Sequence, residues 1–348
     1  LFERSMQLSD FDFDLPESLI AQHPADRRED SRMLIVDRAA GGLIDSTFSE
    51  FASQLGPKDL LVVNNTRVFP ARLIGRTETG AAIEVFLISE ADTNSWLALA
   101  KPGKRLRTGK RINFGEGLSG VVEEKFEDGR VRIGFESATN LNDLIDKYGR
   151  TPLPPYIRRD KAAAGTDRER YQTVYAKTRG SIAAPTAGLH FTPEILDSIR
   201  RRGTEIAEIT LHVGYGTFQP VRADVLSDHR VMAERYEIDS ATAERLQNAK
   251  DSGKRIVAVG TTTTRALESN FSSNGRFEAM RTDADLTITP GFEFQAVDAI
   301  LTNFHLPQSS LLILTSTFGG HDLIMNAYRH AVDSEYRFYS YGDCMFIR

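Results

Sequence analysis

Cysteine and long apolar runs are what this sequence most lacks. Of its 348 residues only Cys344 is a cysteine, so no internal disulfide can form and no site with several thiolate ligands can be built. This composition fits a reducing compartment best, and we expect the protein in the cytoplasm. The apolar run at residues 311–314 ends at once at Thr315. No segment approaches a bilayer span, and we expect no membrane contact.

Several catalytic signatures are missing as well. None of the seven histidines forms a His-x-x-x-His or Cys/His spacing, and we therefore expect no metal site. The chain has no Gly-x-Ser-x-Gly elbow, which leaves a hydrolase triad without support. A positive net charge is absent too. The charge is −5, so contact with a nucleic acid would have to come from a local basic patch.

One such patch is present in the first half of the chain. Its members are Lys101, Lys104, Arg105, Arg107, Lys110 and Arg111. A solvated hairpin explains this run, and so does an edge that contacts phosphates, and both interpretations remain open. In the second case, each phosphate contact should change the salt slope of RNA binding by about 0.7 for single strands and about 0.9 for duplexes.

Two regions of the chain have different patterns of apolar and polar residues. Hydrophobic residues make up 41% and charged residues 26% of it, the balance of a globular protein, and the length suggests about two domains. From about residue 71 to residue 149, short alternating runs and turn residues predict a small β-sandwich or β-barrel. Elsewhere strands and helices alternate, as at residues 241–252 (helix) and 255–260 (strand), which predicts an α/β layer or barrel. The all-β block therefore looks like an insertion into an α/β domain.

Three glycine-flanked segments carry candidate chemistry. Residues 257–265 predict a strand, a Gly-Thr loop and a helix start whose N–H groups can hold an anion, although on shape alone a threonine-rich helix cap is the simpler interpretation. Residues 212–218 follow a predicted strand end, where α/β folds bind ligands, but a glycine turn explains them equally well. Residues 183–191 deliver His190 just before a helix, and such a histidine is more often structural than catalytic.

Eight longer blocks resemble the signature segments of one family. They are residues 64–68, 152–157, 171–175, 183–191, 211–218, 259–262, 302–307 and 337–343. Together they resemble the S-adenosylmethionine:tRNA ribosyltransferase-isomerases, the enzymes of queuosine biosynthesis. The resemblance runs from Met6 to Arg348, and many long blocks in the right order are far more specific than one short motif.

This resemblance implies a fold and a reaction. The fold would be α/β, with a barrel-like α/β main domain at residues 1–70 and 150–348 and an inserted small all-β (β-barrel) domain at residues 71–149. The reaction would move and isomerise the ribosyl unit of S-adenosylmethionine onto the aminomethyl group of 7-aminomethyl-7-deazaguanine in tRNA. It would release adenine and methionine. The protein would be a monomer with tRNA and S-adenosylmethionine as partners, without a metal or a tightly bound cofactor.

One block departs from the family pattern. The family reads His-x-Met-His-x-Glu, and here the segment runs from His229 to Glu234 with Met232 in place of the second histidine. A catalytic duty of that second histidine therefore cannot be carried over to this chain. His229 and Glu234 match the pattern.

The implied reaction makes three demands on its site. A base must remove a proton from the ribose C5′, whose hydrogens the neighbouring sulfonium makes acidic. Adenine needs a proton as it leaves, and the attacking amine must be neutral. Histidine suits such transfers, and each is typically worth about 10²- to 10⁴-fold in rate. The candidates for catalysis are His190, His212, His229, Glu234, His305 and Asp298, and we expect His212 or His190 to be the general base or acid.

Other candidates would bind the substrates. They are Gly214, Gly216, Thr217, Gly260, Thr261, Thr262, Arg265, Thr186 and Asn303. Backbone N–H groups at residues 260–262, together with Arg265, would hold the methionine carboxylate. The modified nucleotide would leave its stack and lie against aromatic faces, for which Tyr215, Phe218 and Phe304 are candidates.

Two other functions compete with this one. A methyltransferase that uses S-adenosylmethionine would yield S-adenosylhomocysteine rather than adenine and methionine, but the chain lacks a Gly-x-Gly-x-Gly loop after its first strand. A non-catalytic RNA-binding module could use the basic run. It would leave the histidine- and glycine-rich blocks between residues 183 and 306 unexplained, and it predicts tRNA binding without turnover of S-adenosylmethionine.

Overall fold

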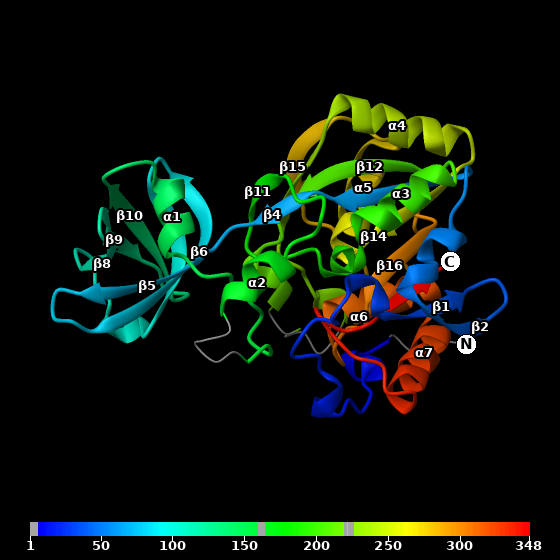
Figure 1. The fold of residues 1–348 in the computed structure, drawn as a ribbon, viewed down its shortest axis with the longest axis horizontal. Coiled ribbons are helices and arrows are strands. Elements are labelled where there is room, and N and C mark those ends of the chain that lie inside the picture. The colour runs from blue at the N-terminus through cyan, green and yellow to red at the C-terminus, as the bar shows by residue number, and fades with distance from the viewer. Residues whose placement is uncertain (1–5, 159–163, 219–220, 222–225) are drawn as a thin grey trace.

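A computed structural model describes residues 6–158, 164–218, 221 and 226–348 of the chain. The candidates Arg105, Thr217 and Phe218 have side chains outside the described part. A small β-rich part lies beside a larger part of mixed helices and strands (Figure 1). Within the described ranges, no helix is both long and apolar enough to cross a membrane.

Nine of the described strands form one mixed sheet, in the order β15-β13-β12-β3-β14-β16-β17-β1-β2. Their bounds are β1 (Arg32–Asp37), β2 (Gly42–Thr47), β3 (Asp59–Asn64), β12 (Glu205–Leu211), β13 (Glu234–Ile238), β14 (Arg255–Val259), β15 (Met280–Ala284), β16 (Ala299–Asn303) and β17 (Cys344–Ile347). Strands β12, β3, β14 and β16 run parallel. Their carboxyl ends therefore meet at one edge, where open α/β sheets bind ligands.

Both faces of this sheet are covered, which explains why its central strands are apolar throughout. Along β3, Leu60 and Val62 belong to one core, and Leu61 and Val63 belong to the other. The first core contains α4 (Ser240–Asp251), α5 (Thr261–Asn274), α6 (Ser310–Gly319) and α7 (His321–Asp333). The second core contains α3 (Pro193–Arg201) and the 3-10 helix η4 (Phe48–Gln54).

Local sequence signals fix several helix ends. The side chain of Thr192 accepts a hydrogen bond from the N–H of Ile195 at 3.3 Å, and Pro193 is the first residue of α3. Gly260 has a φ of 91°, which favours glycine, and it turns the chain directly from β14 into α5. The helix and strand predicted at residues 241–252 and 255–260 are confirmed as α4 and β14.

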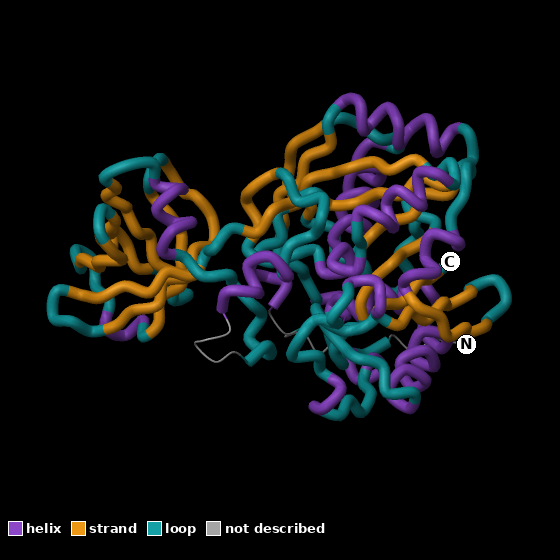
Figure 2. Tube along the Cα trace, viewed as in Figure 1, coloured by secondary structure: helices purple, strands orange, loops and turns teal. Residues whose placement is uncertain are grey.

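Six antiparallel strands form a closed barrel, in the order β10-β7-β6-β5-β8-β9. They are β5 (Arg72–Thr77), β6 (Ala82–Asp92), β7 (Ser95–Lys101), β8 (Arg111–Gly115), β9 (Leu118–Lys125) and β10 (Arg130–Ser137). Val85, Leu87 and Ile133 are fully buried in its core, and strand colours dominate this part of the molecule (Figure 2). The α/β fold class with a small β-barrel is confirmed, whereas the domain boundaries near residues 70 and 150 stay a prediction.

A short junction joins the barrel to the sheet. Strand β4 (Thr66–Val68) leads from β3 toward β5 and pairs in parallel with β11 (Thr178–Ser181). Helix α1 (Leu141–Tyr148) packs against β5 and β10, and α2 (Ala164–Arg170) follows it in the chain. Both chain crossings between the two parts therefore lie close to β4 and β11 (Figure 1).

Candidate active site

One cavity lies at the carboxyl ends of the parallel strands. The segments that follow β14 and β16 line it, together with residues 183–187. The space between its walls is about 1050 Å³, counted out to open solvent. The predicted site residues that line it are Thr186, Gly216, Glu234, Gly260, Thr261, Thr262, Arg265, Asn303 and His305.

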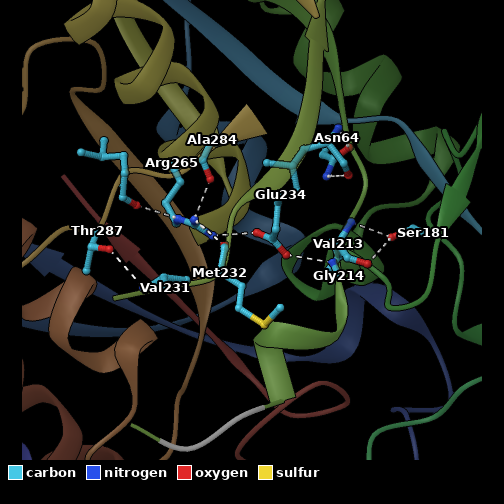
Figure 3. A network of polar contacts seen from close by, with 12 residues as sticks. Asn64, Ser181, Val213, Gly214, Val231, Met232, Glu234, Arg265, Ala284 and Thr287 are labelled. Atoms are coloured by element: carbon cyan, nitrogen blue, oxygen red, sulfur yellow. Dashed lines mark hydrogen bonds and ion pairs between the residues drawn. The ribbon is translucent and has the colours of Figure 1, made fainter. Parts of the chain in front are cut away.

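A buried ion pair forms part of the cavity wall (Figure 3). The Arg265 Nη1 atom lies 2.7 Å from Glu234 Oε2, and the two side chains are only 5% and 3% exposed. Arg265 also donates to the carbonyls of Leu286, Met232 and Ala284. Four of its five N–H groups are thus engaged within the described residues, one of them with Glu234, and a contact of Arg265 with a ligand carboxylate stays a prediction.

The other oxygen of Glu234 accepts from the backbone N–H of Gly214 at 2.9 Å. Gly214 therefore meets the site through its main chain (Figure 3). The side chain of Met232 is 49% exposed, and this residue is not among the described residues that line the cavity. The Met232 side chain packs beside Gly216, which lines the cavity, so the position of the family's second histidine borders the cavity in this chain.

His305 is the predicted histidine that lines the cavity. Its Nε2 lies 2.9 Å from Thr302 Oγ1, and its backbone N–H donates to the Tyr328 hydroxyl at 2.9 Å. No partner for its Nδ1 is found among the described residues. Burial lowers the pKa of His305 from 6.5 to about 3, so the imidazole is neutral near pH 7.

His190 meets the cavity through Asn303. The Asn303 Nδ2 atom lies 3.2 Å from His190 Nε2, and it also donates to the carbonyls of Tyr339 and Asp343 at 3.2 and 3.3 Å. Because carbonyls only accept, the amide must turn its nitrogen toward them, and Nε2 of His190 acts as an acceptor. The proton of His190 then resides on Nδ1, which lies 3.0 Å from Ser31 Oγ.

The amide oxygen of Asn303 is buried and has no hydrogen-bond partner among the described residues. Such an acceptor costs about 1–3 kcal/mol, and a ligand that donates an N–H or O–H to it would recover that energy. Burial, and then the guanidinium groups of Arg28 and Arg337, lower the pKa of His190 to about 3. The ring behind Asn303 is therefore neutral as well.

His212 and His229 do not line the cavity among the described residues. The Nδ1 of His212 lies 2.8 Å from Thr66 Oγ1, and its ring occupies the space that a Cβ on Gly180 would need. The Nε2 of His229 lies 2.9 Å from the hydroxyl of Ser310, which does line the cavity. Burial lowers the pKa of both rings.

Asp298 lies at the other end of the sheet. Its Oδ2 accepts from the N–H of Ile256 at 2.8 Å, at the start of β14, whereas the cavity begins beyond Val259. The carboxylate thus links the start of β16 to β14. It is too far along the strand to serve the cavity, and the site proposed below does not include it.

The basic run belongs to the barrel and does not line the cavity among the described residues. Arg111 forms a two-pronged ion pair with Glu136, at 2.5 and 2.8 Å. Its neighbour Ile112 pairs with Thr77, at the end of β5 remote from the junction. Lys101, Lys104 and Arg107 are exposed, and Lys110 is half-buried. Contact of this run with RNA stays a prediction.

The start of α5 faces the cavity without a side-chain cap among the described residues. The hydroxyls of Thr263 and Thr264 donate backward, to the carbonyls of Val259 and Gly260, at 2.7 and 3.1 Å. The interpretation of a threonine-rich helix cap is therefore wrong in its geometry. The N–H groups of the first turn remain available to an anion, as residues 257–265 also suggested.

Two aromatic residues of the cavity wall were not among the candidates that the sequence analysis named. The rings of Tyr156 and Tyr339 lie with centroids 4.0 Å apart, and the Tyr156 hydroxyl is hydrogen-bonded to Ser340. Tyr339 has a φ of 73°, which is uncommon outside glycine and often marks a functional segment. Both lie in family blocks, residues 152–157 and 337–343, but a block does not reveal which side chains point inward.

The stacking candidates have different positions. Phe304 lines the cavity, whereas Tyr215 packs toward the barrel, with its ring centroid 6.3 Å from that of Phe86. No cluster of three or more potential metal ligands occurs within the residues that the structure describes. Together, a mixed α/β sheet, a closed β-barrel and a largely apolar cavity with a few buried polar groups at the strand ends are the features of an enzyme with a small-molecule site.

Comparisons with known proteins make the class more specific. The chain belongs to the family described as queuosine biosynthesis protein, whose model matches residues 8–347. A relative from Syntrophotalea carbinolica is 48% identical over 344 residues, covering 98% of this chain and 100% of that protein. One from Staphylococcus saprophyticus is 47% identical over 346 residues, with the same coverage. Both are named S-adenosylmethionine:tRNA ribosyltransferase-isomerase.

A solved structure resembles the chain as well. The crystal structure of S-adenosylmethionine tRNA ribosyltransferase from Thermotoga maritima is 35% identical and matches with a TM-score of 0.55. The match covers 98% of this chain and 100% of that one. The shared fold therefore includes both the sheet and the barrel.

Proposed function

We propose that this protein is an S-adenosylmethionine:tRNA ribosyltransferase-isomerase. It transfers and isomerises the ribosyl unit of S-adenosylmethionine onto the aminomethyl group of 7-aminomethyl-7-deazaguanine in tRNA, which gives epoxyqueuosine and releases adenine and methionine. One observation carries the proposal. In a chain that its relatives match from end to end, a single cavity combines an uncapped helix start, a buried Glu234–Arg265 pair and the neutral His305.

The cavity offers a separate partner for each polar part of S-adenosylmethionine. The first turn of α5 suits the methionine carboxylate, because uncapped N–H groups and the helix dipole both favour an anion. The Glu234 carboxylate lowers the energy of a sulfonium nearby, while Arg265 keeps that carboxylate in place. The unpartnered oxygen of Asn303 suits a donor such as a ribose hydroxyl or an amino group.

His305 is the proposed proton carrier. In the free protein, with a pKa of about 3, the ring is unprotonated at neutral pH but is a weak base, so removal of the acidified C5′ proton of the ribose requires this pKa to rise toward neutrality in the substrate complex. The resulting imidazolium then returns the proton to the departing adenine. His190 is a positioning residue in this scheme, because it acts through Asn303.

The modified base of the tRNA needs a second partner. Enzymes that act on a base usually extrude it and hold it against aromatic faces. Tyr156, Tyr339 and Phe304 all line the cavity, and burial raises the pKa of both tyrosines. They therefore stay neutral, and their rings are suited to stacking on the 7-deazaguanine.

The products distinguish this function from its competitors. The purified protein is incubated with S-adenosylmethionine and tRNA that carries the aminomethyl-deazaguanine, and the products are separated by chromatography. We expect adenine and methionine in equal amounts. S-adenosylhomocysteine in their place would support a methyltransferase, and tRNA binding without loss of S-adenosylmethionine would support an RNA-binding module.

We further propose that the protein acts as a monomer in the cytoplasm, where its tRNA substrate is found, without a metal or a tightly bound cofactor. Sedimentation at assay concentration should give one species near 38.8 kDa. Adenine release should be unchanged by excess EDTA.

A further inference from the structure

A second cavity lies at the junction between the sheet and the barrel. Its space is about 1110 Å³, counted out to open solvent, and it lies against β4, β11, α1 and α2. Four arginines and two acidic residues line it, which gives its walls a formal charge of +2. The whole chain has a net charge of −5, so the charge of this cavity is opposite in sign to that of the protein. The charged residues are Arg28, Arg67, Arg168, Arg179, Asp146 and Glu169. We call it the arginine cavity.

The cavity wall holds two carboxylates for its four arginines, and Arg28 and Arg168 also donate to backbone carbonyls. Arg179 pairs with Asp146 at 2.6 Å. For Arg28, Arg67 and Arg168, however, no carboxylate lies within 4.0 Å among the described residues. Arg67 and Arg179 are direct neighbours in the pairing of β4 with β11, which places two guanidinium-bearing residues side by side. Like charges on neighbouring strands repel, and the carboxylate of Asp146 offsets the charge of Arg179 alone.

Unpartnered donors point to the same conclusion. The Thr173 side chain is 5% exposed, lines the arginine cavity and has an Oγ1 with no hydrogen-bond partner among the described residues. The Nη2 of Arg179 is buried and has no partner either. Buried donors without partners are rare and need an explanation. The exposed guanidinium groups of Arg67 and Arg168, beside the same space, suit the oxygens of a phosphate.

The two cavities are neighbours along the chain. Tyr171 lines the active-site cavity, and Thr173 lines the arginine cavity. Arg179 and Ala183 likewise lie on one cavity each, and four residues of extended chain span at most about 14 Å. A nucleotide chain that places a base in the first cavity therefore has backbone phosphates within reach of the second.

We propose that the arginine cavity binds a backbone phosphate of the RNA substrate, beside the nucleotide that enters the active-site cavity. The proposal rests on the function proposed above. It locates an RNA contact at the junction, in addition to the basic run of the barrel. It also accounts for an acidic protein that acts on a polyanion, because the positive charge is concentrated where the RNA backbone must pass.

Arg67 is the residue of choice for the test, because its side chain is exposed and its replacement should not disturb folding. Binding of substrate tRNA to wild type, Arg67→Gln, Arg67→Glu and Arg67→Lys is measured without S-adenosylmethionine at several salt concentrations. Arg329→Gln is the matched control, because Arg329 is exposed on α7, far from the barrel (Figure 1).

We expect Arg67→Gln to weaken tRNA binding about tenfold and to reduce the salt slope by about 0.7–0.9. Arg67→Glu should weaken it further, while Arg67→Lys and Arg329→Gln keep the wild-type slope. The KM for tRNA should rise in the Gln variant and the KM for S-adenosylmethionine should not. Wild-type tRNA affinity and slope in both Arg67→Gln and Arg67→Glu would overturn the phosphate site, even if the enzyme releases adenine. Absence of adenine release by the wild type would instead overturn the proposed function.

Discussion

The barrel and the large sheet bury different kinds of side chains. Among the buried polar and charged residues of the described chain, only Thr77 and Ser95 belong to barrel strands. The strand ends of the sheet, in contrast, bury two histidines, an ion pair and an asparagine within or beside one cavity. The barrel can thus be stabilised by apolar packing alone. The sheet end holds polar groups that are costly to bury, which is characteristic of a functional site.

Replacement of His305 by glutamine should have the largest effect on activity. The amide can still bond to Thr302 but cannot carry a proton, so adenine release should fall by about 10²- to 10⁴-fold. The melting temperature should change little. His330→Gln is the control, because this partly exposed ring contacts Asp45 and lies outside the cavity. Wild-type turnover in His305→Gln would remove His305 from the proposed chemistry.

Loss of one partner of the Glu234–Arg265 pair should have the largest effect on stability. Arg265→Met leaves a buried carboxylate without its partner and should lower the free energy of unfolding by about 3–5 kcal/mol, measured in urea. The matched barrel variant is Arg111→Gln, which breaks the exposed pair with Glu136 and should cost about 0–1 kcal/mol. Equal losses in both variants would contradict the contrast between the two regions.

A cavity in the barrel core should reduce stability without reducing the intrinsic activity. Ile133 is fully buried there, so Ile133→Ala should cost about 2–5 kcal/mol. Adenine release per folded molecule, at a temperature where the variant is folded, should match the wild type. A loss of turnover in the folded variant would show that the barrel shapes the active site directly.

The buried histidines should make stability depend on pH in a defined direction. His190 and His305 have folded-state pKa values of about 3, against 6.5 ordinarily. As the pH falls below about 6.5, these two histidines bind protons in the unfolded chain but not in the folded chain, so the free energy of unfolding decreases. Each ring contributes a slope of up to about 1.4 kcal/mol per pH unit. Burial raises the pKa of Glu268 and Asp343, which opposes this trend, because the folded chain takes up those protons more readily than the unfolded chain does.

The measurement is the unfolding free energy between pH 7.5 and pH 5.5 (chosen to stay above about pH 5, where carboxylates titrate). The free energy should be nearly constant above pH 7 and fall below pH 6.5. The slope should be smaller in His305→Gln, which no longer titrates. A stability that rises on acidification over this range would contradict the assignment of neutral, buried rings.

Sequence patterns predicted the elements well because local signals decide them. The alternation in the barrel strands, the cap at Thr192 and the turn at Gly260 are all consequences of nearest neighbours. The family blocks also identified most residues of the cavity. Side-chain direction was not predictable in the same way. His212 and His305 both follow strand ends, yet only His305 lines the cavity, because the ring of His212 is bonded to Thr66.

Long-range pairings explain the other differences. The sequence analysis assigned Arg265 to a carboxylate of the substrate. In the structure its guanidinium group donates to the carboxylate of Glu234, which lies 31 positions away in the sequence. The arginine cavity combines residues of η3 (Arg28–Asp30), β4, α2 and β11. They form no local charge run, so a sequence window could not reveal them. The basic run at residues 101–111 was found from the sequence because its members are close together in the chain.

The fate of a doubly labelled S-adenosylmethionine tests the central claim most directly. The donor carries one isotope in its ribose and another in its methyl group, and the tRNA is recovered after reaction and washed free of small molecules. The proposed function predicts the ribose label in the tRNA and the methyl label in free methionine. The methyl label in the tRNA, with the ribose label left in S-adenosylhomocysteine, would contradict it.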